Sequence, residues 1–552
     1  METPEQREGN AGSASRVIFA GLLIWCITKS LWLSDDSLIT SRVILNFFSG
    51  HGLVFNIGEK VQAYTHPLWL LLGSICSLIT GNTNTGLLLL SISCCTLTII
   101  CAGRLLEHQI SFCLFCSLWM LTPAVLDYSS SGLENPLGYL LITMSLLNIK
   151  RRQTRLAIAC LSALPLIRLD YALISLPISL GTIWIDCRRR RNLPEKFIWF
   201  SLKHFGIGII ASLLPTSIYL LASKIYYGYY LPNTFWAKSG TGLKTLAATQ
   251  ERIQQGLIYI SSALQQSPTG PIVIAFTIYL LASEARKHLG HDLIPSRHAL
   301  TDNSHENIRS YKKHHQSTEL YALNTIQITA GISSLLYITY IICIGGDFMD
   351  GRFMSIPFFL MTTNTCLTMD YASSTISSAF KSSLIYASSV AIIATLIVNT
   401  TMPSTFTDGA IKKDLSSLVN QYGIADERAY YIASRGLYGI DLEVFQAGNI
   451  SNAKKHLGNL DKIEYRKEPI VMCGGLGRSG MIYLYKHHVD QCALADAFLS
   501  RIQPERGFRV GHYKRALPEG YLDSIKTQKN LVSNKDYKDL LESVWTRIKQ
   551  QH

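Results

Sequence analysis

Charged residues are scarce in this chain: only 16% of its 552 residues are Asp, Glu, Lys or Arg, whereas 48% are hydrophobic. Soluble globular proteins carry about 25% charged residues. No low-complexity run accounts for the deficit, so fibrous, collagen-like and disordered classes are excluded. Because the apolar residues form blocks long enough to cross a bilayer, the sequence predicts a polytopic membrane protein.

The cysteines lack the spacing of a metal module, because no two CxxC pairs occur among the 13 of them. Most lie within apolar segments, where cysteine behaves as a small hydrophobic residue. Cys473 and Cys492 lie in the polar C-terminal part. They can pair if this part is outside the cytoplasm, and two free thiols are an equal alternative.

The N-terminal stretch does not have the pattern expected of a cleavable signal peptide. Residues 16–34 form one apolar stretch with no small-residue cleavage site before Asp35. We therefore expect an uncleaved signal-anchor helix.

The net charge of +13 does not indicate nucleic acid, because the basic residues form short clusters between apolar blocks. This is the positive-inside pattern of a membrane protein. The clusters at 150–155, 188–196 and 286–313 are predicted to be cytoplasmic.

Apolar blocks occur at 16–34, 67–80, 85–101, 110–126, 136–149, 155–167, 171–186, 197–223, 271–284, 321–344, 353–369 and 383–400. If the N-terminus and the three basic clusters lie inside, the short block at 67–80 does not span. We expect it to lie on, or dip into, the outer surface. About eleven spans then remain, since a spanning helix needs roughly 17 to 25 residues. An odd number of spans places the chain beyond residue 400 outside.

The composition changes at residue 401, so we expect a transmembrane domain at 1–400 and an extracytoplasmic domain at 401–552. About 150 residues suffice for one domain with its own core. The apolar runs at 469–472 and 481–484 are predicted to be buried strands, and 493–502 and 535–550 to be helices. The predicted fold is an all-α transmembrane bundle followed by a small α/β domain.

Asp35 and Asp36 stand where the first membrane helix ends. A carboxylate at this boundary can accept the proton of a sugar hydroxyl, as a general base must. Two adjacent carboxylates also repel each other, which raises one pKa. The alternative is an acidic cap at the water boundary.

Single charges stand at the outer ends of later blocks, namely Glu134, Arg168, Asp170, Asp347 and Arg352. Charges near bilayer depth usually line a polar cavity or pair with one another. The alternative is simple solvation of loops. In the large outer loop, Lys238 offers a point charge for phosphate and Trp236 a face for stacking a sugar; an interfacial anchor is the alternative.

Two further patterns are weaker. Gly475, Gly477 and Gly480 match a dinucleotide fingerprint, but nucleotides are scarce outside the cytoplasm, so we interpret them as a tight strand-to-helix turn. The stretch 285–320 holds six histidines at irregular spacing, which favours a solvated loop over a metal site: His288, His291, His298, His305, His314 and His315.

The string from Asp35-Asp36 to Trp69 resembles the first outer loop of the terminal arabinofuranosyltransferases of mycobacterial cell walls and their bacterial relatives, which are polyprenyl-phosphate-dependent GT-C glycosyltransferases. Its matching residues are Asp35, Asp36, Arg42, Asn46, Gly50-His51-Gly52-Leu53-Val54-Phe55-Asn56 and Tyr64-Thr65-His66-Pro67-Leu68-Trp69. Later matches are Ser131-Gly132-Leu133-Glu134, Arg168, Asp170, Pro232-Asn233-Thr234, Lys238, Gly345-Gly346-Asp347, Arg352, Asp490, Leu494, Asp496, Gly511-His512 and Pro518-Glu519-Gly520-Tyr521. His66 and Leu169 depart from the family's usual Asn or Ser and Pro, so the sugar stays open.

The resemblance implies a GT-C-like bundle that transfers a sugar from a polyprenyl phosphate to a glycan or lipid-linked acceptor, at the outer face of a bacterial inner membrane. It implies a periplasmic C-terminal domain and neither a cofactor nor nucleic acid, and it leaves a divalent metal open. Asp35 or Asp36 would be the general base, with Asp36 preferred because Asp35 lies closer to the membrane helix and can serve as its cap. Arg352 and Lys238 would hold the donor phosphate. Other residues expected to bind donor or substrate are Arg42, Asn46, Tyr64, His66, Glu134, Arg168, Asp170, Asn233, Asp347 and His512.

A transporter or flippase of lipid-linked sugars is the rival function, because it would also use intramembrane charges. Such proteins often show symmetry between their halves, and none is visible in this sequence. A scaffold for envelope assembly, with purely structural charges, is a third interpretation.

The topology can be tested by cysteine accessibility on intact cells. Cysteines introduced within 401–552 should react with a membrane-impermeant thiol reagent, and those within 285–320 should react only after lysis, because the basic clusters orient the chain. A C-terminal part that stays protected from the reagent would contradict the eleven-span arrangement.

Overall fold

The computed structural model is mostly helical and describes residues 4–189, 197–239, 246–291, 306–372, 418–435, 441–505 and 511–548. The helices of the N-terminal part are α1 (Pro4–Lys29), α2 (Asp35–Phe48), α3 (Pro67–Thr80), α4 (Thr83–Leu105), α5 (Gln109–Met120), α6 (Pro123–Asp127), α7 (Asn135–Lys150), α8 (Thr154–Ala163), η1 (Leu164–Leu166), η2 (Leu169–Tyr171), α9 (Ala172–Arg189), α10 (Phe197–Tyr227), α11 (Asn233–Ser239), α12 (Leu246–Gln266), α13 (Thr269–His291), α14 (Glu306–Ile344) and α15 (Ser355–Ala372).

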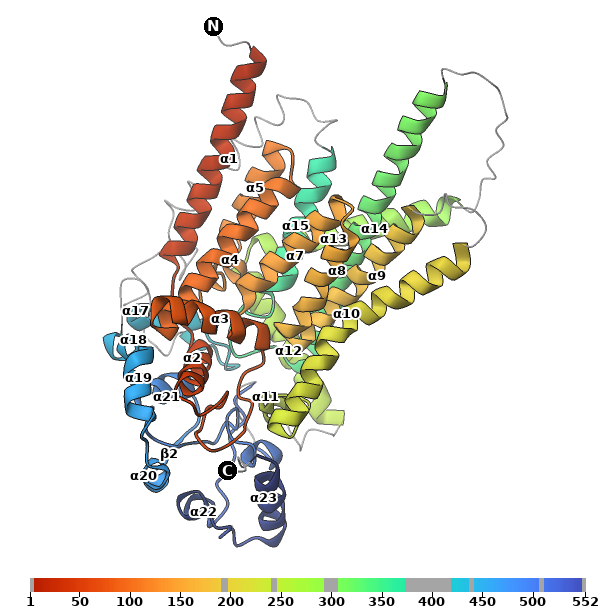
Figure 1. The fold of residues 1–552 in the computed structure, drawn as a ribbon. Helices are drawn as coiled ribbons and strands as arrows, with labels where there is room; N and C mark the ends of the chain where they lie inside the picture. Colours follow the sequence, from red (N-terminus) through yellow and green to blue (C-terminus); the bar gives the residue numbers. More distant parts are fainter. Residues whose placement is uncertain are drawn as a thin grey trace.

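The long helices run side by side as a bundle, and α2, α3 and the C-terminal elements gather at one end of it (Figure 1). Aromatic side chains fill the core where α5, α7 and α15 meet: Tyr139 stacks on Phe359 with a centroid distance of 4.5 Å, and both rings pack against Trp119. The bundle therefore holds the polar loops between its helices at a common end.

Three of the described helical segments are long and apolar enough to cross a membrane: Thr83–Leu105, Gly206–Tyr227 and Tyr321–Ile344. Shorter apolar helices are Pro67–Thr80, Gln109–Met120, Thr154–Leu166 and Thr269–Glu284. The structure thus agrees with a helical membrane protein, while the count of eleven spans stays a prediction. The last predicted span, 383–400, lies outside the described residues.

Helix α3 is the short apolar block that we expect on the outer surface. Its 14 residues begin at Pro67 and end at Thr80, and the left-handed backbone of the following Gly81 (φ 70°) stops the helix. They cover about 21 Å, less than the roughly 30 Å of a bilayer core. In Figure 1, α3 lies across the end of the bundle, and it exposes an apolar stripe: Leu71, Ile75, Leu78 and Ile79.

The C-terminal part contains α17 (Glu427–Arg435), α18 (Leu442–Ala447), α19 (Ile450–Leu457), α20 (Lys462–Lys467), β2 (Ile470–Met472), α21 (Leu476–Ile482), β3 (His488–Asp490), η6 (Leu499–Arg501), α22 (Tyr521–Thr527) and α23 (Lys535–Ile548). Strands β2 and β3 pair in parallel, with Ile470 opposite His488. The predicted strand at 469–472 and the predicted helix at 535–550 are confirmed by β2 and α23.

Two predicted elements in this part are wrong. The run 481–484 begins as the last turn of α21 and is no strand, and the stretch 493–502 contains only the short 3-10 turn η6. Apolar runs of about four residues fit a buried strand or a buried helical turn equally well. The cysteine question left open by the sequence is resolved, because Cys473 and Cys492 form a disulfide that joins the chain just after β2 to the chain just after β3.

Candidate active site

A cavity of about 350 Å³ lies where the polar loops of the bundle meet the C-terminal part. Its polar and charged lining residues are Asp36, Thr40, Thr65, His66, Arg168, Asp170, Lys238, Arg252, Asp347 and Arg352. Apolar and aromatic side chains line the rest, among them Ile39, Tyr64, Phe235, Tyr340, Ile344 and Phe353. The cavity can therefore hold a ligand with both polar and apolar parts.

The adjacent carboxylates of Asp35 and Asp36 point in different directions. Both lie in the first turn of α2, after the cap residue Ser34, whose hydroxyl accepts a hydrogen bond from the amide of Ser37. Asp36 lines the cavity. Asp35 is turned to the C-terminal part, where the amide of Gly477 donates to its carboxylate at 2.8 Å. The structure thus places one member of the pair at the cavity.

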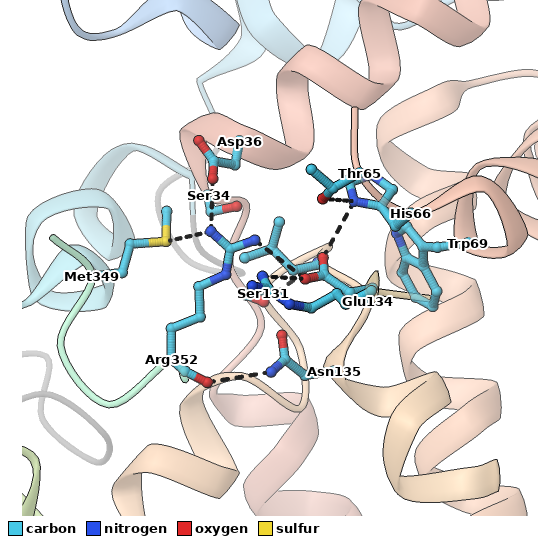
Figure 2. A network of polar contacts seen from close by, with 12 residues as sticks. Ser34, Asp36, Thr65, His66, Trp69, Ser131, Glu134, Asn135, Met349 and Arg352 are labelled. Carbon is cyan, nitrogen blue, oxygen red and sulfur yellow. Dashed lines mark hydrogen bonds and ion pairs between the residues drawn. The ribbon is translucent and has the colours of Figure 1, made fainter. Parts of the chain in front are cut away.

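Arg352 lies at the centre of the ion pairs (Figure 2). Its guanidinium donates to Oδ2 of Asp36 at 2.7 Å and to Oε1 of Glu134 at 3.3 Å, and it lies 3.8 Å from Oδ2 of Asp347. The residue is only 4% exposed. A charge so deeply buried must be paired, and Arg352 satisfies this by joining α2, the start of α7 and its own loop.

The loop that carries Arg352 needs its glycines. Gly346 and Gly351 have positive φ angles of 77° and 71°. A Cβ at Gly346 would also lie 2.5 Å from the side chain of Tyr259. The tyrosine hydroxyl in turn donates to the carbonyl of Met349 at 3.0 Å. Close packing of this loop against α12 therefore fixes the backbone position of Arg352.

Arg168 forms the second half of the network. It makes a two-pronged contact with Asp170, at 3.0 Å from Nε and 2.7 Å from Nη2. Its Nη1 donates to the same Glu134 oxygen that binds Arg352, at 3.3 Å. The hydroxyl of Tyr337 on α14 donates to Asp170 at 3.1 Å. One buried carboxylate, Glu134, therefore bridges two arginines.

The protonation states follow from these contacts. Burial alone would raise the pKa of Glu134, but the neighbouring charges, of which Arg352 contributes most, together outweigh it and the pKa falls to about 2. Burial is likewise outweighed at Asp36, where Arg352 and Lys238 lower the pKa. Burial lowers the pKa of His66. At neutral pH the site thus holds ionised carboxylates beside a neutral imidazole.

Lys238 lines the cavity, and His512 lies between two lining residues, Gly511 and Tyr513. Lys238, near the end of α11, lies 3.7 Å from Asp347 and keeps 37% of its side chain exposed. The ring of His512 packs edge-on against Phe348, with a centroid distance of 4.1 Å. Lys238 is therefore a cation of the cavity wall, whereas His512 contacts the lining residue Phe348.

Three residues expected to bind donor or substrate are used elsewhere. Arg42 donates to backbone carbonyls of the first loop and the C-terminal part, including those of Phe55 and Gly480. Asn46 donates to the carbonyls of Val54 and Phe55. Asn233 donates to carbonyls in 493–496. None of the three lines the cavity, and each holds a loop in place. Tyr64 does line it, with its hydroxyl bonded to that of Tyr227.

Sequence reasoning missed Arg252 and Tyr513, which both line the cavity. Arg252 lies in the amphipathic helix α12, and its position offered only the weak signal of a basic residue in a predicted outer loop. Among the described residues no group of three or more His, Cys, Asp or Glu could hold a metal ion. The histidine stretch 288–315 falls on residues whose side chains lie outside the described part.

The glycine motif follows β2, and Gly475 forms the tight turn into α21, as interpreted from the sequence, whereas Gly477 and Gly480 lie within α21 itself.

Comparison with known proteins confirms the resemblance. The chain is similar to the terminal β-(1→2)-arabinofuranosyltransferases of Mycobacterium tuberculosis, at 26% identity over 370 residues, and of Corynebacterium glutamicum, at 24% over 355 residues. These alignments cover 62% and 61% of this chain. The chain spans about half the length of these relatives, 53% and 48%. No family model matches it.

Solved structures of ArnT from Cupriavidus metallidurans are similar over most of the chain. The crystal structure bound to undecaprenyl phosphate has a TM-score of 0.43 at 11% identity and covers 87% of this chain and 86% of that one. The apo structure has a TM-score of 0.39 at 12% identity and covers 89% and 76%.

Replacing Glu134 by Gln should destabilise the protein. The change leaves Arg352 and Arg168 buried without the carboxylate that they share, and breaking a buried ion pair costs about 3–5 kcal/mol. Unfolding of the purified protein in detergent measures the loss. The matched control is Glu464→Gln, which removes an exposed pair with Lys467 and should change stability by at most about 1 kcal/mol. Equal stability of the two variants would contradict the bridging role.

The same network predicts a pH dependence. Glu134 has a pKa of about 2 in the folded state, below its ordinary value of 4.5. Its contribution is therefore fully present above pH 4.5 and is lost as the pH falls towards 2. Unfolding measured from pH 7 to pH 3 should show a steeper loss of stability for the wild type than for Glu134→Gln. Parallel curves would show that Glu134 does not contribute in this way.

Proposed function

We propose that this protein transfers a sugar from a polyprenyl-phosphate donor to a hydroxyl of a cell-envelope glycan or lipid-linked acceptor, at the outer face of a bacterial inner membrane. The observation that carries the proposal is the carboxylate of Asp36, held 2.7 Å from Arg352 at the wall of a cavity that also contains Lys238. The relatives named terminal β-(1→2)-arabinofuranosyltransferase support a glycosyl transfer.

The chemistry requires one base and one anion site. The acceptor oxygen attacks the anomeric carbon of the donor sugar and forms the new glycosidic bond. Asp36 takes the proton of the acceptor hydroxyl. The bond between the anomeric carbon and the phosphate oxygen breaks, and its electron pair leaves with the polyprenyl phosphate. A positioned carboxylate is suited to the first task, and fixed cations such as Lys238 and Arg352 to stabilising the developing phosphate charge.

The cavity also suits a lipid-linked sugar in size and polarity. About 350 Å³ is at the lower end of the range for small-ligand pockets. The charged residues Asp36, Arg352 and Lys238 would face the sugar and its phosphate, whereas Tyr340, Ile344 and Phe235 offer apolar surface for the start of the prenyl chain. Neither the sugar phosphate alone nor the prenyl chain alone would match both the charged and the apolar residues of the lining.

Asp36 should be the base and Asp35 should not. Asn is nearly isosteric with Asp but cannot take a proton, and general bases contribute about 10²–10⁴-fold to rate. We expect Asp36→Asn to show no measurable transfer from a labelled polyprenyl-phosphate sugar while still binding this donor. Asp35→Asn should be milder. If both variants turn over within a few-fold of wild type, the general-base assignment is wrong, and transport of lipid-linked sugars becomes the favoured function.

Arg352 should be needed for turnover. Removing one charge-assisted contact to a developing anion costs about 2.7–4 kcal/mol in comparable sites, so Arg352→Ala should lose at least about a hundredfold in kcat. Arg352→Lys should recover part of it, because lysine keeps the charge and loses the two-pronged geometry. Near-normal turnover of the alanine variant would remove Arg352 from the active site.

A further inference from the structure

Helix α2 presents two different faces, and only one belongs to the cavity. Asp36, Ile39 and Thr40, which are three and four positions apart, line the cavity. Asp35 and Arg42, which are seven positions apart, face the C-terminal part. Residues with these spacings share one side of a helix. Whatever holds the second face therefore sets the position of the first.

The second face is held by α21. The amides of Gly477 and Arg478 donate to the two separate oxygens of Asp35, at 2.8 Å and 3.0 Å. Seven residues further along α2, Arg42 donates to the carbonyl of Gly480 at 2.6 Å. We call these residues the α2–α21 contact: Asp35 and Arg42 of α2 with Gly477, Arg478 and Gly480 of α21.

Two glycines allow this close approach. A Cβ at Gly477 would overlap with the backbone carbonyl oxygen of Asp35. A Cβ at Gly480 would lie 2.7 Å from the ring of Phe55 and 3.0 Å from the side chain of Arg42. Gly477 and Gly480 lie three residues apart, so they occupy the same side of α21. The glycine pattern is thus explained by helix packing, with no need for a nucleotide.

The remainder of the C-terminal part fixes α21 in turn. The Cys473–Cys492 disulfide lies immediately before the turn into α21. Arg478 also donates to Asp441 at 3.1 Å, and Ser479 is hydrogen-bonded to His488 on β3 at 3.1 Å. α21 is therefore anchored to its own domain on the sides that do not face α2.

We propose that the α2–α21 contact positions Asp36 for catalysis, with Asp35 and Gly477 as positioning residues supplied from either side of the contact. The C-terminal part is then a required component of the active site, although α2 contributes the carboxylate. This inference rests on the proposed function, in which Asp36 is the base.

The test uses the full-length protein and two variants that disturb the contact to different degrees. Gly477→Ala should push α21 away from Asp35, and a misplacement of about 1 Å can cost a hundredfold in rate. Asp35→Asn replaces one acceptor oxygen by a donor and so removes one of the two amide hydrogen bonds, which should cost roughly tenfold in kcat, about 1.4 kcal/mol. The KM for a labelled polyprenyl-phosphate sugar should stay within a few-fold in both.

Amide hydrogen exchange of residues 35–48 provides a readout that needs no substrate. Exchange should become faster in both variants, because the outer face of α2 loses its partner. The matched control is Asp523→Asn, which removes an exposed ion pair with Lys526 within α22 and touches neither α2 nor α21. It should leave both kcat and the exchange of α2 within about twofold of wild type, as expected for a surface substitution.

Unchanged exchange in both variants would overturn the contact itself. Faster exchange with unchanged kcat would overturn its positioning role, as would a loss confined to KM. If Gly477→Ala does not fold, the milder Asp35→Asn carries the same test. A wild-type protein that transfers no sugar would refute the proposed function and with it the catalytic role of the contact, whereas the exchange data would still decide whether the contact holds α2.

Discussion

A buried guanidinium must be neutralised, and this requirement at Arg352 determines how the site is built. A charge that is 4% exposed is stable only with partners in place. Arg352 finds them in Asp36 of α2, in Glu134 before α7 and in Asp347 of its own loop. Segments more than 300 residues apart in sequence are thereby brought to one point, and a cavity with fixed charges forms around it.

The same reasoning explains the division of labour at the start of α2. Asp36 balances Arg352, and Asp35 binds two amides of α21. A carboxylate at the cavity wall is useful only if its helix does not shift, and α2 has just 14 residues. The glycines of α21 let a second helix approach closely enough to hold it. The ion pair with Arg352 on one face of α2 and the packing against α21 on the other thus fix the position of the Asp36 side chain.

The sequence predicted much of this and missed the rest for physical reasons. Hydropathy found the apolar helices, and the resemblance found Asp36, Glu134, Arg168, Asp347 and Arg352, which the structure brings together. The sequence favoured Asp36 over Asp35 only because Asp35 lies closer to the membrane helix. The contact that turns Asp35 away from the cavity is made 442 residues further along the chain and is not visible in the sequence. Three polar residues were expected from the sequence to bind a ligand: Arg42, Asn46 and Asn233. In the structure they donate hydrogen bonds to backbone carbonyls and so hold loops in place. A polar side chain can serve either purpose. The short run 481–484 was wrongly predicted to be a strand, because four apolar residues do not distinguish a buried strand from a helical turn.

The central claim is that a sugar is transferred in the cavity and is not merely bound or moved. Incubation of the purified wild-type protein in lipid vesicles, with a polyprenyl-phosphate donor labelled in the sugar and an envelope glycan acceptor, tests it most directly. The account predicts that label appears in the acceptor and that free polyprenyl phosphate is released in equal amount. Label that stays on the lipid, whether bound to the protein or carried intact to the other leaflet, would contradict it.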